Sequence, residues 1–302
     1  MRWDDVVSNA PLHLDEAERG RFASDGYLAF AGLIGHDELD DLQRALADLV
    51  DQSRSLTASN GTFDLEIGHS HDNPRLRRVA CVDDSDSVFW RFCSTSVLVD
   101  IAADILGPEV RFRDAFANLK WAEGGAAVDW HQDLAFYPHT NSGTCQFIVA
   151  LDDITEANGP LTVIPGSHRD GMYSHYADDG TWIGAIPVER VGVDRVASAR
   201  QITGSAGTVS VHHSLTLHYS APNHSDASRP ALVVTYAAAD AAPYTAPPYT
   251  SSHYGEIVRG VEPGVAHHEE MTVILPPDWS HGYTSIFDHQ HSATDEPASE
   301  EA

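Results

Sequence analysis

From residue 110 onward the sequence becomes rich in short runs of β-forming residues, and this change most limits which folds the chain can adopt. From there, short β-rich runs follow one another, at 110–121, 145–151, 161–164, 208–219 and 230–237. Turn signals separate them, among them Asn158-Gly159-Pro160 and Pro165-Gly166. Many short strands with turns between them predict a sandwich or a barrel.

Helices are expected before these strands. Residues 12–53 predict a helix, a short strand and a second helix, whose leucines at steps of three and four form one apolar stripe: Leu39, Leu42, Leu46 and Leu49. Asp37 is the expected N-cap of that second helix. A further helix fits residues 97–106, with Ser96 as its cap and Gly107 at its end. We expect these helices to pack on the outside of a core.

We therefore predict a mainly β fold with flanking helices, in a single domain over residues 1–291. Its parts would be a helical N-terminal region at 12–106, a barrel core at 110–237 and a lid or C-terminal extension at 238–291. Residues 292–302 are acidic and predict a disordered tail.

Charge and composition exclude several kinds of partner. The formal net charge is −27, so the surface repels nucleic acid and anionic membranes. No apolar run reaches the ~18 residues of a membrane span, and the acidic start of the chain does not resemble a signal peptide. The three cysteines are few, odd in number and far apart, which argues against a disulfide framework. We expect a cytoplasmic monomer or homodimer that acts on a small molecule.

The segment Trp130-His131-Gln132-Asp133 carries the clearest chemistry. In a strand, residues i and i+2 point to the same face, so His131 and Asp133 would present an imidazole and a carboxylate side by side. Fe(II) held by two histidines and one carboxylate keeps positions open for other ligands. A hydrogen-bonded or surface His-Asp pair is the alternative, in a chain with 18 histidines. The third ligand would come from a later strand that the barrel brings alongside.

A histidine-rich segment at 211–223 supplies candidates for that ligand. In a continuous strand, His212 and His218 would share one face and His213 would lie on the other. Arg229 lies eleven residues past His218 (229 − 218), at the start of an apolar run, so a returning strand would place it near His218. A guanidinium there could hold a carboxylate by two parallel hydrogen bonds.

Four stretches, in their order and spacing, make the chain resemble the phytanoyl-CoA dioxygenase family of Fe(II)/2-oxoglutarate oxygenases over about residues 15–236. They are Trp130-His131-Gln132-Asp133, Asn158-Gly159-Pro160-Leu161, Pro165-Gly166-Ser167-His168, and His218-x-Ser220-x-x-Asn223 followed by Arg229. The resemblance implies a double-stranded β-helix, a cupin-like jelly-roll barrel. Tyr219 departs from the pattern, because the family more commonly has Gly there, and we expect it to affect the pocket more than the metal.

The resemblance implies the ligand set of the metal. His131, Asp133 and His218 would bind Fe(II). Among the histidines of the later segment, His218 is preferred because Ser, Asn and Arg follow it at the family spacing, and His213 is the next candidate.

The resemblance also implies how the cosubstrate 2-oxoglutarate is bound. Arg229, helped by Ser220, would hold its distal carboxylate. Asn118 would contribute to this binding, and Lys120, two residues later in Asn118-Leu119-Lys120-Trp121, would reach the same cosubstrate. It is the only lysine among 18 basic residues, and a chemical requirement would explain its retention.

The implied reaction uses O2 and 2-oxoglutarate to hydroxylate an unactivated C–H bond of a small-molecule metabolite or natural-product intermediate, with release of succinate and CO2. Asp133 argues against halogenation, because halogenases of this type lack the carboxylate. Desaturation, epimerisation and ring closure stay open, since they start from the same hydrogen abstraction. A cupin-like metal-dependent hydrolase or isomerase would leave Arg229 without a purpose. An intact ligand set argues against a non-catalytic barrel.

Substrate residues are expected at the mouth of the barrel. Four candidates directly follow the His-x-Asp segment: Phe136, Tyr137, His139 and Asn141. A later loop carries three tyrosines, Tyr244, Tyr249 and Tyr254, and ends near Arg259, the fifth candidate for contact with substrate. We expect this loop to fold over the iron site as a lid, with packing or a dimer contact as the alternative. Few basic residues are present to meet an anionic CoA ester, so an uncharged or zwitterionic substrate is expected.

The remaining histidines show no ligand pattern. His168 follows a Pro-Gly turn and is expected to be structural, or to support a ligand. His69 and His71 are expected in a surface loop. Five more are irregularly spaced and expected to be solvated: His267, His268, His281, His289 and His291.

Overall fold

The structure is a computed structural model that describes residues 10–122, 124–281 and 285–292. Its first part has the expected helix, strand and helix, namely α2 (Glu16–Asp25), β1 (Tyr27–Phe30) and α3 (His36–Ser53). Asp15 and Glu18 form a capping box at the start of α2. The N-cap of α3 is Gly35 and not Asp37, because the helix begins at His36 and Asp37 lies in its first turn.

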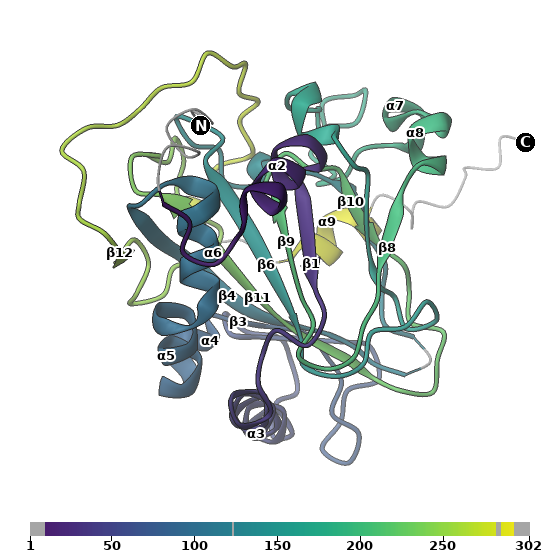
Figure 1. Cartoon of the computed structure of the whole chain (residues 1–302). Helices are drawn as coiled ribbons and strands as arrows, with labels where there is room; N and C mark the ends of the chain where they lie inside the picture. Colours follow the sequence, from purple (N-terminus) through teal and green to yellow (C-terminus); the bar gives the residue numbers. More distant parts are fainter. Residues whose placement is uncertain (1–9, 123, 282–284, 293–302) are drawn as a thin grey trace, which may run out of the picture.

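The other N-terminal helices follow two short strands. They are α4 (Val82–Ser85), α5 (Ser87–Thr95) and α6 (Val97–Leu106), after β2 (Phe63–Leu65) and β3 (Leu76–Ala80). Ser96 caps α6 by accepting a hydrogen bond from the backbone of Leu98, and Gly107 ends it, both as predicted. In Figure 1, α4, α5 and α6 lie beside β4, the strand that all three contact. None of the described helices is long and apolar enough to span a lipid bilayer.

The large sheet is antiparallel, with the strand order β1-β9-β6-β11-β4-β3-β2. Its longer strands are β4 (Val110–Lys120), β6 (Thr144–Ala150), β9 (Val209–His213) and β11 (Arg229–Ala238). A short strand, β12 (Ile257–Arg259), pairs with the beginning of β4. The runs expected at 110–121, 145–151 and 230–237 are therefore β4, β6 and β11.

The small sheet is also antiparallel and has the order β5-β10-β7-β8. Its strands are β5 (Val128–His131), β7 (Leu161–Val163), β8 (Arg200–Ile202) and β10 (His218–Ser220). From β4 to β11 the chain passes back and forth between the two sheets, with β4, β6, β9 and β11 in the large one and β5, β7, β8 and β10 in the small one. This winding confirms the predicted double-stranded β-helix, a jelly-roll barrel.

The run at 208–219 is not one strand. Residues 209–213 form β9 in the large sheet, a turn at 214–216 follows, and residues 218–220 form β10 in the small sheet. The chain crosses from one sheet to the other between His212 and His218, so strand parity does not relate these two side chains.

The two faces of the large sheet have different surroundings. On β4, Ala115 and Ala117 point into the main apolar core, where the leucine stripe of α3 is also buried, as predicted. Asp114, Phe116 and Asn118 alternate with them and line a pocket on the opposite face. The candidate site therefore lies between the two sheets, inside the barrel.

The C-terminal part after β11 has little regular structure before α9 (Ile286–Ser292). Figure 1 shows the chain beyond β12 running as a long loop outside the barrel, while α9 lies among the barrel strands, where it contacts β5. Gln290 of α9 accepts a hydrogen bond from the backbone of Asp129 at 2.9 Å. Ser292, expected as the first residue of the acidic tail, ends α9, and residues 293–302 lie outside the described residues.

Candidate active site

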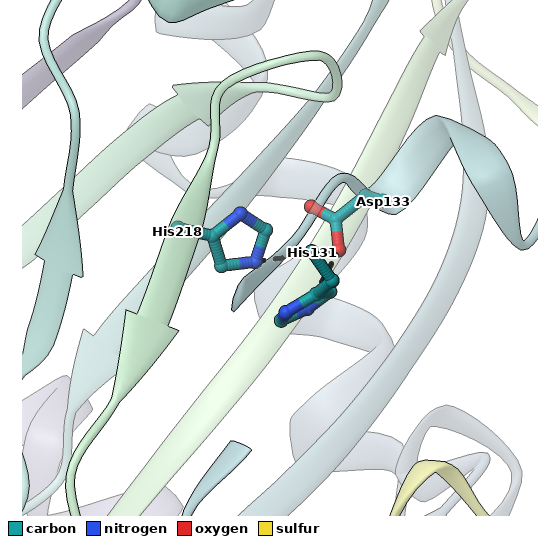
Figure 2. Close-up of side chains that lie close together, drawn as sticks. All are labelled: His131, Asp133 and His218. Carbon is teal, nitrogen blue, oxygen red and sulfur yellow. Dashed lines mark ion pairs between the residues drawn. The ribbon is translucent and has the colours of Figure 1, made fainter. Parts of the chain in front are cut away.

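The three predicted iron ligands lie together. His131 is the last residue of β5, and His218, the first residue of β10, pairs with it directly. Asp133 begins a short 3-10 helix (Asp133–Ala135), so it does not lie on the strand as expected. Gln132 between them has extended backbone (φ −126, ψ 129), and His131 and Asp133 therefore still point to the same side. Figure 2 shows the three side chains converging.

The distances in this triad fit a metal site. Asp133 Oδ1 lies 3.8 Å from His131 Nε2 and 3.6 Å from His218 Nε2, and one ligand atom from each residue lies within 4.8 Å of the others. Among the described residues this is the one such group of His, Cys, Asp or Glu. Two histidines and one carboxylate are the donor set typical of non-haem Fe(II) oxygenases.

Backbone carbonyls orient both imidazoles. Nδ1 of His131 donates to the carbonyl of Asp129 at 2.7 Å, and Nδ1 of His218 donates to that of Thr216 at 2.9 Å. A proton on Nδ1 leaves the Nε2 lone pair directed at the centre of the triad, which is how histidine ligands are commonly held.

Burial also sets the charges of the triad. It lowers the pKa of His131 far below the ordinary imidazole value and that of His218 to about 4. Burial alone would raise the pKa of Asp133, but the facing imidazoles, including a hydrogen bond from His212, outweigh it and lower this pKa. The triad therefore offers two neutral imidazoles and one carboxylate at neutral pH, the forms that bind a metal.

His212 takes part in the site without belonging to the triad. It comes from β9 in the opposite sheet, and its Nε2 lies 2.9 Å from Asp133 Oδ2. It therefore holds the carboxylate oxygen that faces away from the two ligand histidines. The histidine-rich sequence indicated that His212 is near the site, but its role depends on the two sheets facing each other.

His213 is not placed as a ligand. Its Nδ1 accepts a hydrogen bond from the backbone of Leu215 at 3.1 Å, and its ring packs near that of His168. His168 itself bonds the carbonyl of Ala23, in keeping with the structural role expected for it.

Gln132 and His175 support the metal-binding segment, and the sequence did not single them out for this. The fully buried amide of Gln132 donates to the carbonyls of Gly171 and Leu215 and accepts from the backbone of Tyr173. His175 Nε2 accepts from the backbone of Gln132 at 2.9 Å. These bonds fix the turn between the two adjacent ligands.

Arg229 lies in the same pocket as the triad, together with Ser220 and Asn118. It begins β11 and is only 5% exposed. Burial lowers the pKa of Arg229 to about 10, so the guanidinium remains charged at neutral pH. Within the described residues no carboxylate forms an ion pair with it. A buried cation without an anionic neighbour is costly unless a ligand supplies the anion.

Lys120 does not line this pocket, although it faces Arg229 across the β4–β11 pair. Its Nζ donates to the carbonyls of Ser220, at 3.1 Å, and Ala221. A Cβ atom at Gly159 would lie 2.9 Å from Lys120 Cδ, so this glycine gives the lysine its space. Burial and the charge of Arg229 lower the pKa of Lys120 to about 6. The lysine is thus held by the backbone of the β10 turn, a contact that the resemblance did not imply.

Two of the four expected substrate residues line the pocket, namely Phe136 and Tyr137. His139 and Asn141 do not, because the chain has already left the pocket toward β6. His139 bonds the carbonyl of Tyr137 and lines a separate cavity beside Arg111. The Asn141 amide donates to the carbonyl of His267 and so holds the C-terminal segment.

Arg259 lies away from the pocket. It is part of β12, which pairs with Val110 at the start of β4, and it forms an ion pair with Asp100 of α6. The pocket is lined by residues further along β4, from Arg113 to Asn118. Arg259 therefore binds a helix and is not among the residues that line the pocket.

Only part of the predicted lid reaches the site. Pro248 and Tyr249 line the pocket, and Tyr249 Oη accepts a hydrogen bond from Arg78 at 3.1 Å. Tyr244, on the same loop, is 47% exposed. Ile286 of α9 adds an apolar wall from the last described helix.

Several lining residues had no signal in the sequence. Arg78, Arg113 and Asp114 sit on strands whose register, and not local spacing, brings them to the pocket. His69 is half-buried between the carbonyls of Arg75 and Ser53, and not a simple surface residue as expected.

Comparisons with known proteins agree with this geometry. A family model described as phytanoyl-CoA dioxygenase (PhyH) matches residues 22–231. A probable alpha-ketoglutarate-dependent hypophosphite dioxygenase from Stutzerimonas stutzeri is 30% identical over 283 residues, which cover 92% of this chain and 98% of that protein. An L-proline trans-4-hydroxylase from Streptomyces griseoviridis is 30% identical over 234 residues, covering 72% and 84% respectively.

The fold has solved counterparts as well. The crystal structure of EctD from S. alaskensis with bound Fe has a TM-score of 0.67 and 23% identity, and the match covers 88% of this chain and 92% of that one. This likeness shows a shared fold, and the family match shows the relationship. The chain therefore belongs to the phytanoyl-CoA dioxygenase (PhyH) family of iron(II)- and 2-oxoglutarate-dependent dioxygenases.

Proposed function

We propose that this enzyme hydroxylates an unactivated C–H bond of a small-molecule metabolite or natural-product intermediate. One observation carries the proposal: the buried guanidinium of Arg229, without a carboxylate partner in the described chain, shares a pocket with the buried triad. The pocket thus provides for a metal and for an anionic cosubstrate. Phe136, Leu161 and Ile286 add an apolar wall for a substrate.

The reaction balances with the reagents of the family. One atom of O2 enters the substrate as a hydroxyl group, and the other enters succinate as 2-oxoglutarate loses CO2. The four electrons that reduce O2 come in pairs, from the C–H bond and from the decarboxylation. His131, Asp133 and His218 would hold iron(II), which would supply the redox chemistry needed to activate O2.

The residues of this chain bind the cosubstrate, orient the reactants and shield the reacting centre from water. Arg229 would pair with the distal carboxylate of 2-oxoglutarate through two hydrogen bonds, and Ser220 would help it. The apolar walls exclude water from the reacting centre. Asp133 occupies the position that a halogenase leaves to chloride, so hydroxylation is favoured over halogenation. Desaturation, epimerisation and ring closure would use the same residues, and the product distinguishes them.

A small substrate agrees with the size of the cavity and with the substrates named for two relatives. The cavity holds about 100 Å³, and hypophosphite and L-proline, named in two relatives, are small. A CoA ester is disfavoured by the net charge of −27. Hypophosphite is the second candidate, because the relative named for it matches nearly the whole chain.

We place the enzyme in the cytoplasm, a proposal supported by three free cysteines, two of them buried.

The test is succinate formation by the purified, iron-loaded protein, with oxygen insertion into candidate metabolites followed by mass spectrometry. His131→Ala, Asp133→Ala and His218→Ala should each abolish turnover and leave the fold intact by circular dichroism. His213→Ala is the matched control and should be far milder, since His213 contacts backbone and not the triad. Activity without 2-oxoglutarate would instead indicate a cupin-like hydrolase or isomerase. Full activity in one triad variant would remove that residue from the ligand set.

A further inference from the structure

Two consecutive residues of β4, Arg113 and Asp114, both line the pocket of the triad. In a regular strand they would point to opposite faces. The β4–β11 register shifts here, because Thr235 pairs with Asp114 but Tyr236 pairs with Phe112. Arg113 is thus the extra residue of a β-bulge, a feature that re-aims side chains and is frequent next to active sites.

Around the bulge lies a group of buried polar atoms that lack hydrogen-bond partners among the described residues. Arg113 is 3% exposed, and its Nη1 donates to Asp114 Oδ2. Its Nε and Nη2 have no hydrogen-bond partner among the described residues, and neither do Asp114 Oδ1 and the Tyr137 hydroxyl. Leaving such atoms unpaired in the protein interior is costly, most of all for charged groups. Their grouping in one pocket indicates that a ligand satisfies them.

The position of this group is defined by Tyr137. The guanidinium of Arg113 stacks on the Tyr137 ring, 3.5 Å from its centroid. Burial and the charge of Asp133 raise the pKa of Tyr137 well above its ordinary value, so its hydroxyl stays protonated. Tyr137 follows the metal-binding turn directly, and it therefore connects the Arg113–Asp114 pair to the triad.

The charges of the pair select the kind of ligand. Arg113 offers donors to an anionic group, while Asp114 offers an acceptor to a cationic or N–H group. A simple oxyanion would satisfy Arg113 but face the carboxylate of Asp114, and a simple amine would face Arg113. The dianionic cosubstrate is directed to Arg229, which lacks the acidic neighbour that Arg113 has.

We propose that the substrate is a small, amino-acid-like zwitterion, whose carboxylate is bound by Arg113 and whose ammonium or N–H group is bound by Asp114, with the Tyr137 hydroxyl as a third contact. This assignment rests on the proposed hydroxylase function and names its substrate class. The zwitterion brings no net charge into a pocket whose Arg113–Asp114 pair is itself neutral.

The first experiment compares ligands on the wild-type, iron-loaded enzyme. Stimulation of succinate release is measured with each proteinogenic L-amino acid and with hypophosphite. For every amino acid that is active, analogues that lack the amine or the carboxylate are measured in the same way. Their binding is also measured anaerobically by calorimetry with 2-oxoglutarate present. At least one amino acid should bind and stimulate, and its single-charge analogues should do neither.

The opposite pattern would overturn the assignment. Stimulation by hypophosphite, or by a lone carboxylic acid or amine, shows that only one half of the pair is used. Succinate release without any amino-acid stimulation or binding also contradicts the zwitterion, but leaves the hydroxylase function in place. An enzyme that makes no succinate under any condition contradicts the hydroxylase itself, while calorimetry still reports whether an amino acid binds.

Variants of the pair provide the second experiment. Arg113→Met and Asp114→Asn should each weaken binding of the active amino acid about 10- to 100-fold, the usual effect of losing a charged hydrogen bond. Arg113→Lys should recover part of the loss. Arg111→Met is the matched control on the same strand, because its guanidinium bonds the carbonyls of Gly255 and Ala239 outside the pocket, and it should bind the amino acid as wild type does.

A single variant leaves a buried charge unpaired and could unfold the protein. The double variant Arg113→Met/Asp114→Leu removes both charges, a replacement that is often neutral for stability. It should melt near the wild-type temperature and show no measurable amino-acid binding. Retained binding in this folded variant would overturn the proposal.

Discussion

Single side chains around Asp133 decide how the metal is held. His212 Nε2 bonds Asp133 Oδ2, so the carboxylate presents Oδ1 to the two ligand histidines. Groups that hydrogen-bond a metal ligand typically change metal affinity or activity by about 10- to 100-fold when removed. His212→Leu should weaken Fe(II) binding to that extent, measured by anaerobic titration, and His212→Gln, which keeps an N–H donor, should recover part of it.

The neighbouring histidine is the control for that experiment. His213→Ala removes a buried ring of the same strand that does not reach Asp133, and Fe(II) affinity should stay near the wild-type value. If His212→Leu binds iron as tightly as wild type, His212 does not position the carboxylate.

Arg229 and Lys120 compete for the role of cosubstrate anchor, and their contacts differ. Arg229 has no carboxylate partner in the described chain, while Lys120 is bound to two backbone carbonyls. Arg229→Leu should cost about 2–5 kcal/mol of 2-oxoglutarate binding, because the buried carboxylate loses its partner. The KM for 2-oxoglutarate should then rise roughly 30-fold or more, with a smaller change for the substrate.

Lys120→Met is the counterpart variant. It should lower the melting temperature, since the carbonyls of Ser220 and Ala221 lose their donor, and leave the KM for 2-oxoglutarate near that of wild type. The reverse result, an unchanged KM in Arg229→Leu and a raised one in Lys120→Met, would restore the lysine to the role that the resemblance implied.

At the scale of elements, the loop between β11 and β12 closes one side of the pocket with two residues, Pro248 and Tyr249. Tyr249→Ala should open this wall and expose the reacting centre to water. We expect iron binding to persist and 2-oxoglutarate turnover to continue, uncoupled from substrate oxidation, as the ratio of succinate to hydroxylated product would show. Tyr244→Ala, on the same loop but outside the pocket, should leave this ratio unchanged.

The alternative role of the loop has a separate signature. If Tyr249→Ala leaves the ratio normal and only the oligomeric state changes, by size-exclusion chromatography, the loop is an interface and not a lid. The oligomeric state itself, monomer or homodimer, stays a prediction, as do the domain boundaries.

For the whole molecule, buried histidines make stability depend on pH. Burial lowers the pKa of His139 and His213 to about 3 and of His175 to about 4, from 6.5. Below pH 6.5 the unfolded chain binds protons that the folded one refuses, so the free energy of unfolding falls as pH falls, by up to about 1.4 kcal/mol per histidine per pH unit. Burial raises the pKa of Asp83 to about 6, so this carboxyl binds a proton more readily in the folded protein than in the unfolded chain. Below pH 6 it therefore offsets the loss of stability that about one buried histidine causes.

Urea unfolding of the metal-free protein at several pH values checks this. The stability should be greatest above pH 6.5 and decrease by more than roughly 3 kcal/mol per pH unit between pH 6 and 4, because the two net protons of these groups add to those that the buried triad histidines, His131 and His218, also do not bind when folded. His139→Gln should lower the pH dependence of the free energy of unfolding by the equivalent of about one proton. A stability that is flat over this range would contradict the prediction.

Local sequence patterns predicted the elements and the triad. The stripe of α3, the caps of α6 and the runs of β4, β6 and β11 follow from periodicity and turn residues, which act over a few positions. The spacing of His131 and Asp133 was enough to predict that they point to the same side, because this needs only one residue of extended backbone between them. His218 and Arg229 were chosen by motif spacing, and the two sheets then brought them into one pocket.

Tertiary structure alone decided the rest, because it depends on the register between strands far apart in sequence. The bulge at Arg113 is set by the pairing of β4 with β11, and alternation along β4 would have put Asp114 and Arg113 on opposite faces. Lys120 and Arg259 found other partners, in the backbone of the β10 turn and in Asp100, which no local pattern encodes. His212 reaches Asp133 because β9 and β5 lie in sheets that face each other, and such a contact exists only once the barrel closes.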